Sequence, residues 1–74
     1  MIAIRFTDAD LARVSPHERA VGRYLQVAAK RQQSKRVTFG LWRAINFTGL
    51  LRTGVQQALA GLAARELISM DGAA

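Results

Sequence analysis

The sequence predicts a mainly helical domain with a small β component, and three patterns support this class. Apolar residues in the C-terminal third recur with helical spacing, at Val55, Ala58, Leu59 and Leu62. The stretch Ser15-Pro16-His17-Glu18 has the composition of a helix start. Residues 2–6 alternate between large apolar side chains and Ala or Arg, which is typical of a short strand or an extended arm.

The N-terminal half is expected to contain that strand and two helices. Residues 7–10 form a capping sequence for one or two helical turns. Ser15 then acts as an N-cap, Pro16 suits the first helical position and Glu18 completes a reciprocal capping box. This longer helix is expected to run to about Arg31. Its inner face is predicted to contain Val21, Tyr24, Leu25 and Ala28.

The C-terminal half predicts two more helices and two short strands. Residues 36–38 are expected to form a strand, with Thr38 as the N-cap of a helix over about 39–48. The inner face of this helix is predicted to contain Leu41, Ala44, Ile45 and Thr48. Gly49 ends it and opens the turn into the third core helix. Residues 67–70 are expected to form the last strand.

Length and composition bound the architecture. The chain has 74 residues and is expected to be one domain over 1–74, near the lower size limit for a self-supporting core. It has no cysteine, which excludes disulfides, thiolate–zinc sites and thiol catalysis. Half of the residues are apolar. In so short a chain some of this surface is expected to stay exposed in a monomer, which favours a homodimer.

The charge distribution indicates an anionic partner. The formal net charge is +6, and the sequence between Arg19 and Arg65 contains no Asp or Glu. The basic residues of this stretch are Arg19, Arg23, Lys30, Arg31, Lys35, Arg36, Arg43, Arg52 and Arg65. Such a nearly single-sign field suits a polyanion such as nucleic acid. The alternatives are a basic surface that keeps the protein soluble, or an arginine bias of the genome.

The segment from Gly49 to Ile68 resembles the turn, recognition helix and first wing strand of winged helix-turn-helix DNA-binding domains, which are common in bacterial and phage regulators. The match comprises the turn glycine, an arginine, four core positions and a closing Leu-Ile pair: Gly49, Arg52, Val55, Ala58, Leu59, Leu62, Leu67 and Ile68. The resemblance implies a winged helix-turn-helix fold with three core helices, a short sheet and a wing.

Three departures from the family pattern change the expected details. Leu51 stands where a capping Ser or Thr is usual, so the cap is expected to shift to Thr53. Glu66 replaces the usual terminal glycine, so the turn into the strand must form without an easy left-handed residue. A turn is predicted at Asp71-Gly72, but the chain stops before a second wing strand. The wing is therefore expected to be missing or rudimentary, with the N-terminal strand pairing with the last strand instead.

The third helix carries the candidates for base recognition. Its exposed face is expected to present, in the first two turns, Arg52, Thr53, Gln56 and Gln57. In helix-turn-helix proteins this end docks in the major groove, where glutamine pairs with adenine and arginine with guanine. The small side chains of Ala60 and Gly61 would permit close approach. The alternative is that the glutamines reflect only helix propensity.

Five basic residues are candidates for phosphate contacts that set register and affinity, namely Lys30, Arg31, Lys35, Arg36 and Arg43. For each of them the alternative is scattered charge on a solvated surface. The aromatic residues Phe39, Trp42 and Phe47 either pack on the first long helix and the N-terminal strand, or form a surface for a dimer or protein partner.

Other kinds of site are not predicted. His17, the only histidine, is interpreted as a surface residue, and no metal site or cofactor is expected around it. No nucleophile–base pair or glycine-rich phosphate loop is visible, so the chain is not expected to be an enzyme. It has neither an apolar run of about 18 residues nor a secretory signal. These features predict a cytoplasmic protein without a membrane partner.

These expectations converge on a double-stranded DNA-binding protein, a dimeric transcriptional regulator of a phage, plasmid or other mobile element. One alternative is an accessory role in replication or recombination, because a helix headed by Ser-Pro-x-Glu is also similar to domains of phage and plasmid replication initiators. The other is a protein-interaction module that uses the same scaffold to inhibit a host complex.

Overall fold

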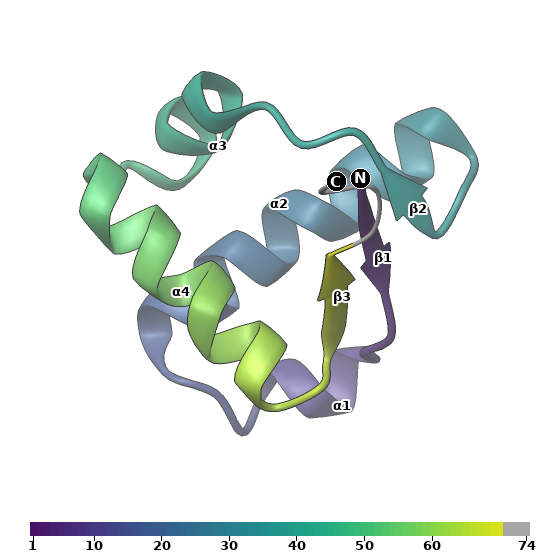
Figure 1. Cartoon of the computed structure of the whole chain (residues 1–74), viewed down its shortest axis with the longest axis horizontal. Coiled ribbons are helices and arrows are strands. Elements are labelled where there is room, and N and C mark those ends of the chain that lie inside the picture. The colour runs from purple at the N-terminus through teal and green to yellow at the C-terminus, as the bar shows by residue number, and fades with distance from the viewer. Residues whose placement is uncertain (71–74) are drawn as a thin grey trace.

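The computed structural model describes residues 1–70 and contains four helices and three short strands in that range (Figure 1). In chain order they are β1 (Ile2–Ile4), α1 (Asp8–Leu11), α2 (Pro16–Gln32), β2 (Arg36–Val37), α3 (Leu41–Thr48), α4 (Arg52–Ala64) and β3 (Ile68–Met70). The prediction of a mainly helical chain with a small β component is confirmed. Within the described range, no helix has the length and apolar character that crossing a lipid bilayer requires.

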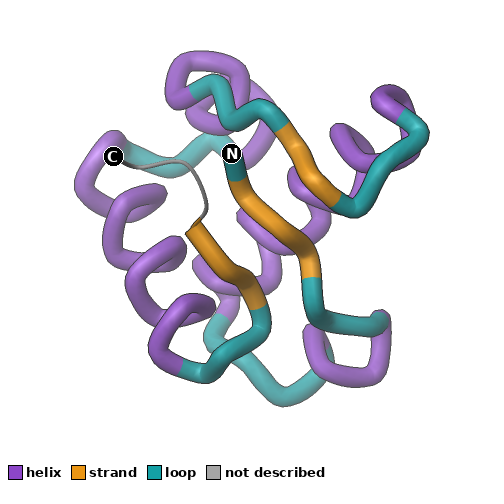
Figure 2. The backbone as a smooth tube through the Cα atoms, turned by 45° about the vertical axis from the view of Figure 1, so that its right-hand side comes forward, coloured by secondary structure: helices purple, strands orange, loops and turns teal. Residues whose placement is uncertain are grey.

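The three strands form one antiparallel sheet in the order β2-β1-β3. Ile2 pairs with Val37 on one side and with Met70 on the other, and Ile4 pairs with Ile68. The predicted pairing of the N-terminal strand with the last strand is therefore confirmed, although both strands are shorter than expected. Figure 2 shows the strands side by side across one face of the helices. The turn predicted at 71–72 lies outside the described residues.

Helix α2 begins at the predicted capping box. Ser15 Oγ accepts a hydrogen bond from the backbone N–H of Glu18 at 3.3 Å, and Glu18 Oε1 accepts from the Ser15 hydroxyl at 2.7 Å. The helix ends one residue after the predicted end, because Gln33 adopts a left-handed backbone with φ 52°. The residues predicted for its inner face are all buried: Val21, Tyr24, Leu25 and Ala28. The shorter cap predicted before it also forms, since Asp10 accepts from the Thr7 N–H.

The start of α3 differs from the prediction, because its N-cap is Gly40 and not Thr38. The backbone N–H of Thr38 donates to Gln32 Oε1 at 3.2 Å, which ties residue 38 to the end of α2. Phe39 then packs edge-on against Tyr24, with ring centroids 6.0 Å apart. These two contacts keep the chain out of the helix until Gly40. Of the predicted inner face, Ala44 is buried, and the three partly buried members are Leu41, Ile45 and Thr48.

The predicted N-cap of α4 at Thr53 is wrong. The N-cap is Leu51, and no side chain caps the helix. Gly49 ends α3 with φ 72°, as expected, and Thr48 Oγ1 accepts from the N–H of Leu50 at 3.2 Å. This hydrogen bond organises the turn before the helix, so α4 starts early enough to place Thr53 inside its first turn.

Helix α4 ends in a glycine-type motif that is built without glycine. Glu66 adopts a left-handed φ of 61°. Its N–H donates to the carbonyl of Ala63 and the N–H of Leu67 donates to the carbonyl of Leu62, both at 3.0 Å. This pair of bonds satisfies the last carbonyls of the helix and turns the chain into β3. The turn thus forms without glycine, because Glu66 itself adopts the left-handed backbone conformation.

The hydrophobic core lies between α2, α4 and the sheet. Leu25 of α2 and both Val55 and Leu62 of α4 have no exposed surface, and Ile2 and Ile68 add the sheet to the same cluster. Full burial of one leucine side chain contributes about 1.5–3 kcal/mol. The orientation of α4 is therefore fixed by its apolar side, which determines what its other side presents to solvent.

A buried carboxylate joins the start of α2 to the end of α4. Glu18 is only 8% exposed, and its Oε2 accepts a hydrogen bond from Arg65 Nε at 2.8 Å. Gly61 lies against this ion pair, because a Cβ atom at position 61 would stand 2.8 Å from Glu18 Oε2. The missing side chain of Gly61 therefore serves the packing of α4 on α2, rather than close approach to a ligand as the sequence suggested.

We expect Gly61→Ala to lower the free energy of unfolding by about 1 kcal/mol, although alanine is the better helix former by a similar amount. The new methyl group must displace a carboxylate whose hydrogen bonds to Ser15 and Arg65 are worth more than the propensity gained. Gly54→Ala is the matched control, since its Cβ would meet only Leu50 Cβ at 3.6 Å. Urea denaturation should show Gly54→Ala no less stable than wild type. A gain in stability from Gly61→Ala would contradict this account of the helix contact.

Candidate nucleic-acid interface

The exposed face of α4 contains the four predicted base-contacting residues. Its buried face consists of Val55, Ala58, Leu59 and Leu62, as predicted from their spacing. Exposed on the other side are Arg52, Thr53, Gln56 and Gln57. The helix itself contains no Asp or Glu, so this face combines one positive charge with amide and hydroxyl groups. It is a surface that can donate and accept hydrogen bonds.

The side chains of this face have no partners inside the described part of the molecule. Among residues 1–70, no hydrogen bond or ion pair engages the side chain of Arg52, Gln56 or Gln57. Thr53 is likewise exposed and engaged only through its backbone. A ligand that approached α4 would therefore not have to break existing side-chain interactions before forming its own.

A shallow hollow of about 330 Å³ lies at the start of α4. His17, in the first turn of α2, lines it together with Thr53 and Gln57. Sequence reasoning placed His17 on the surface, and it is exposed, but the neighbourhood with α4 was missed. No local pattern connects positions 17 and 57; only the packing of α2 against α4 brings them together. His17 is thus an additional hydrogen-bonding group beside the α4 face.

The candidate phosphate-contacting residues lie elsewhere. Lys30 and Arg31 belong to the last turn of α2, Lys35 precedes β2, and Arg36 is the first residue of β2. All four are exposed. Figures 1 and 2 both place this corner of the molecule on the side opposite to the start of α4. The structure therefore separates these residues from the four candidates on α4.

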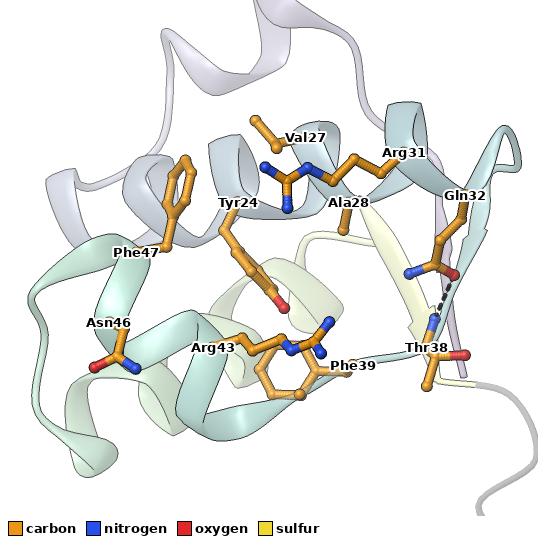
Figure 3. Close-up of a pocket in the computed structure, with 11 residues that line it drawn as sticks. Tyr24, Val27, Ala28, Arg31, Gln32, Thr38, Phe39, Arg43, Asn46 and Phe47 are labelled. Carbon is orange, nitrogen blue, oxygen red and sulfur yellow. Dashed lines mark hydrogen bonds between the residues drawn. The ribbon is translucent and has the colours of Figure 1, made fainter.

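A groove of about 840 Å³ runs between the C-terminal half of α2 and α3 (Figure 3). Arg31 extends from α2 and Arg43 from α3 on its two walls. The ring of Tyr24 lies between them, and the rings of Phe39 and Phe47 also line the groove. The fifth phosphate candidate, Arg43, is thus grouped with Arg31 in this groove. Sequence reasoning missed the groove, because its two walls come from separate helices.

The three aromatic residues of the α3 region have different environments. Phe39 is partly buried and Phe47 is 52% exposed, and each meets Tyr24 edge-on, at centroid distances of 6.0 and 5.6 Å. Both therefore pack on α2, in line with the first of the two alternatives. Trp42 is 72% exposed, which is unusual for so large an apolar side chain and leaves the partner-surface alternative open at that position.

Within the described range, the acidic and histidine side chains do not cluster as metal ligands would. No group of three or more His, Cys, Asp or Glu residues within 1–70 is arranged to hold a metal ion. The chemistry of the described surface is therefore that of hydrogen bonding, positive charge and apolar contact. Comparisons of this chain with protein-family models, with curated proteins and with solved structures gave no match.

Proposed function

We propose that this protein is a sequence-reading double-stranded DNA-binding protein of the winged helix-turn-helix type, with α4 as its recognition helix. The observation that carries the proposal is the two-sided character of α4. Its apolar side is fixed in the core, and its other side presents Arg52, Gln56 and Gln57 without internal partners. These residue types at the start of an exposed helix suit the edges of bases in a major groove.

The arrangement around α4 supports the same proposal. A helix, a short turn and a second helix follow one another from Leu41 to Ala64, and the sheet closes the domain behind them. In a winged domain the strand after the recognition helix pairs with a further wing strand. Here β3 pairs with β1, so the N-terminal strand would take the place of that partner strand.

The basic corner formed by Lys30, Lys35 and Arg36 would contact phosphates at a distance from the reading helix. The described molecule is about 26 Å long, and duplex DNA rises by about 3.4 Å per base pair. A duplex that reaches both regions would therefore run along the molecule and occupy about eight base pairs per protomer. Contacts at the far end would add affinity and register without reading sequence.

Selection from random duplexes at two salt concentrations tests the proposal directly. We expect a defined motif to be enriched at both concentrations, with affinity that falls steeply as salt rises because cations are released from the phosphates. Enrichment of no motif, together with retained salt dependence, would reduce the function to generic charge attraction. Absence of any duplex binding would overturn it.

Two kinds of variant should separate base reading from phosphate contact. Gln57→Ala should change the preferred base at one position and weaken binding to the selected site by about tenfold. Lys30→Ala combined with Lys35→Ala should weaken binding to all sequences alike and reduce the slope of log affinity against log salt by about 2. Both effects are measured by fluorescence anisotropy with selected and scrambled duplexes. An unchanged salt slope in the double variant would show that these lysines do not meet phosphates.

We further propose a regulatory role in the cytoplasm, with a homodimer as the active form. The large exposed side chain of Trp42 supports a self-association surface. A dimer with two-fold symmetry predicts a palindromic selected site, with half-sites about one helical turn apart. A single half-site, bound by a protein that light scattering shows to be monomeric, would contradict the dimer. Binding at an origin or attachment site would favour replication or recombination instead.

A further inference from the structure

The groove between α2 and α3 has the construction of a binding site that is separate from the α4 face. Its apolar lining includes Tyr24 and Val27 of α2 and, at one end, Phe47 of α3. Val27 is 38% exposed and Phe47 is 52% exposed, so the apolar surface is open to a ligand and not closed over. Figure 3 shows these side chains on both sides of the hollow.

The charge of the groove has one sign. Among the described residues, the only charged ones that line it are Arg31 and Arg43, one on each wall (Figure 3). Neither has an ion-pair partner among the residues that the structure describes. Two unpaired guanidinium groups beside an exposed apolar strip are complementary to a ligand that carries carboxylates around an apolar centre.

We propose that this groove binds an acidic amphipathic segment of a partner protein, with apolar side chains against Val27 and Phe47 and carboxylates on Arg31 and Arg43. A helical segment laid in an apolar groove is a common form of peptide recognition. The stretch of α2 from Tyr24 to Arg31 is about 10 Å long at 1.5 Å per residue. The bound segment is therefore about two helical turns in length.

One end of the groove is closed, and this closed end would determine where the bound segment ends. There Gln32 Oε1 accepts the backbone N–H of Thr38 at 3.2 Å, which links the end of α2 to the approach of α3 (Figure 3). At the opposite end, Asn46 and Phe47 make no such link to another residue within 1–70. The segment would enter from the Phe47 end and terminate beside Gln32.

A single-stranded nucleic acid is negatively charged, as an acidic peptide is, but the peptide suits this groove better. Single strands are held by flat aromatic faces on which bases stack. Here Tyr24 is 8% exposed and is contacted edge-on by two other rings, and the adjoining lining residues Val27 and Ala28 are aliphatic. Packing of aliphatic and aromatic side chains is therefore the interaction that the walls offer. This site goes beyond the DNA-binding proposal and does not depend on it.

The test is selection of 12-residue peptides from a random display library against the whole protein, followed by affinity measurement on synthetic copies of the enriched peptides. We expect the enriched peptides to combine apolar residues at helical spacing with several Asp or Glu. In nitrogen-15 NMR spectra, their largest shift changes should fall on amides of the groove residues. Enrichment of neutral or basic peptides, no enrichment, or shifts confined to α4 would overturn the proposal.

Substitutions of groove residues test whether the peptide binds at this site. Arg43→Ala should weaken the acidic peptide by about tenfold, and Val27→Asp should weaken it at least as much by placing a carboxylate among the bound ones. Ala9→Asp on α1 makes the same change in net charge at an exposed helix start, and should leave peptide affinity within twofold of wild type. A single-stranded oligonucleotide that competes for the same NMR-shifted amides, with Val27→Asp abolishing its binding, would assign the groove to nucleic acid instead.

The two proposals fail independently. Val27→Asp and Ala9→Asp should both select the same duplex motif as the wild-type protein, because neither residue lies on α4. If duplex binding is absent while acidic peptides bind the groove, the DNA proposal falls and the groove stands. If Val27→Asp leaves peptide affinity unchanged, the groove proposal falls whatever the result with DNA.

Discussion

Leu62→Ala should remove a large share of the protein's free energy of unfolding. Leu62 has no exposed surface and lies in the main core cluster, and removing a buried leucine in this way costs about 2–5 kcal/mol. A domain of this size is expected to have a total stability of about 4–11 kcal/mol. The cavity would also release the inward side of α4, so the position of Gln57 on the outer face would be lost with it.

The matched control is Leu51→Ala, which deletes the same atoms from the exposed N-cap residue of α4. Leu51 is 79% exposed, so its loss should change the free energy of unfolding by no more than about 0.5 kcal/mol. Urea titrations followed by circular dichroism measure both variants. Similar midpoints for Leu62→Ala and wild type would mean that α4 does not pack through this side.

Glu18→Ala should cost about 2 kcal/mol at pH 7, because it removes a buried charged acceptor from both the capping box and the link to α4. The lost hydrogen bond from Ser15 accounts for the larger part of this cost. The Arg65 side chain is 50% exposed, so its attraction to Glu18 is screened by solvent. Glu66→Ala removes the same charge at an exposed position. Alanine tolerates the left-handed backbone there no better than glutamate does, so the control should stay near wild type.

The loss of stability caused by Glu18→Ala should depend on pH. Burial works to raise the pKa of Glu18, but hydrogen bonds from Ser15 and Arg65, with the charge of Arg65, outweigh it and hold the pKa below the ordinary value of 4.5. Stability from a lowered folded-state pKa is fully present above 4.5 and is lost as pH falls through the lowered value. The gap between wild type and Glu18→Ala, measured by thermal unfolding from pH 7 to pH 2.5, should therefore narrow on the acid side. A constant gap would show that the carboxylate is not held in its charged form.

The order of elements follows from local patterns in the sequence. The capping box at Ser15 and Glu18 encodes its own geometry within four residues, and the period of the apolar residues in α4 fixes its buried side. The predicted starts of α3 and α4 are wrong because hydrogen bonds from residues outside each helix determine where it begins. Gln32 holds Thr38 out of the helix, and the Thr48 hydroxyl organises the turn before Leu51. Intrinsic capping preference gives way to such contacts.

The candidate site was predictable only where it lies on one helix. The exposure of Gln56 and Gln57 follows from the burial of Val55 and Leu59 on the same helix. The groove that pairs Arg31 with Arg43, and the position of His17 beside α4, arise from packing between helices. No spacing rule connects such positions, so a single sequence without its fold does not reveal them.

The central place of β1 in the sheet has a consequence for biosynthesis. Its neighbours lie more than thirty and more than sixty residues further along the chain, at Val37 and Met70. During synthesis, β1 therefore lacks its β3 partner until the chain up to Met70 has been made. The helices can form from contacts that are local in the sequence, whereas the sheet is complete only after residue 70 has been added.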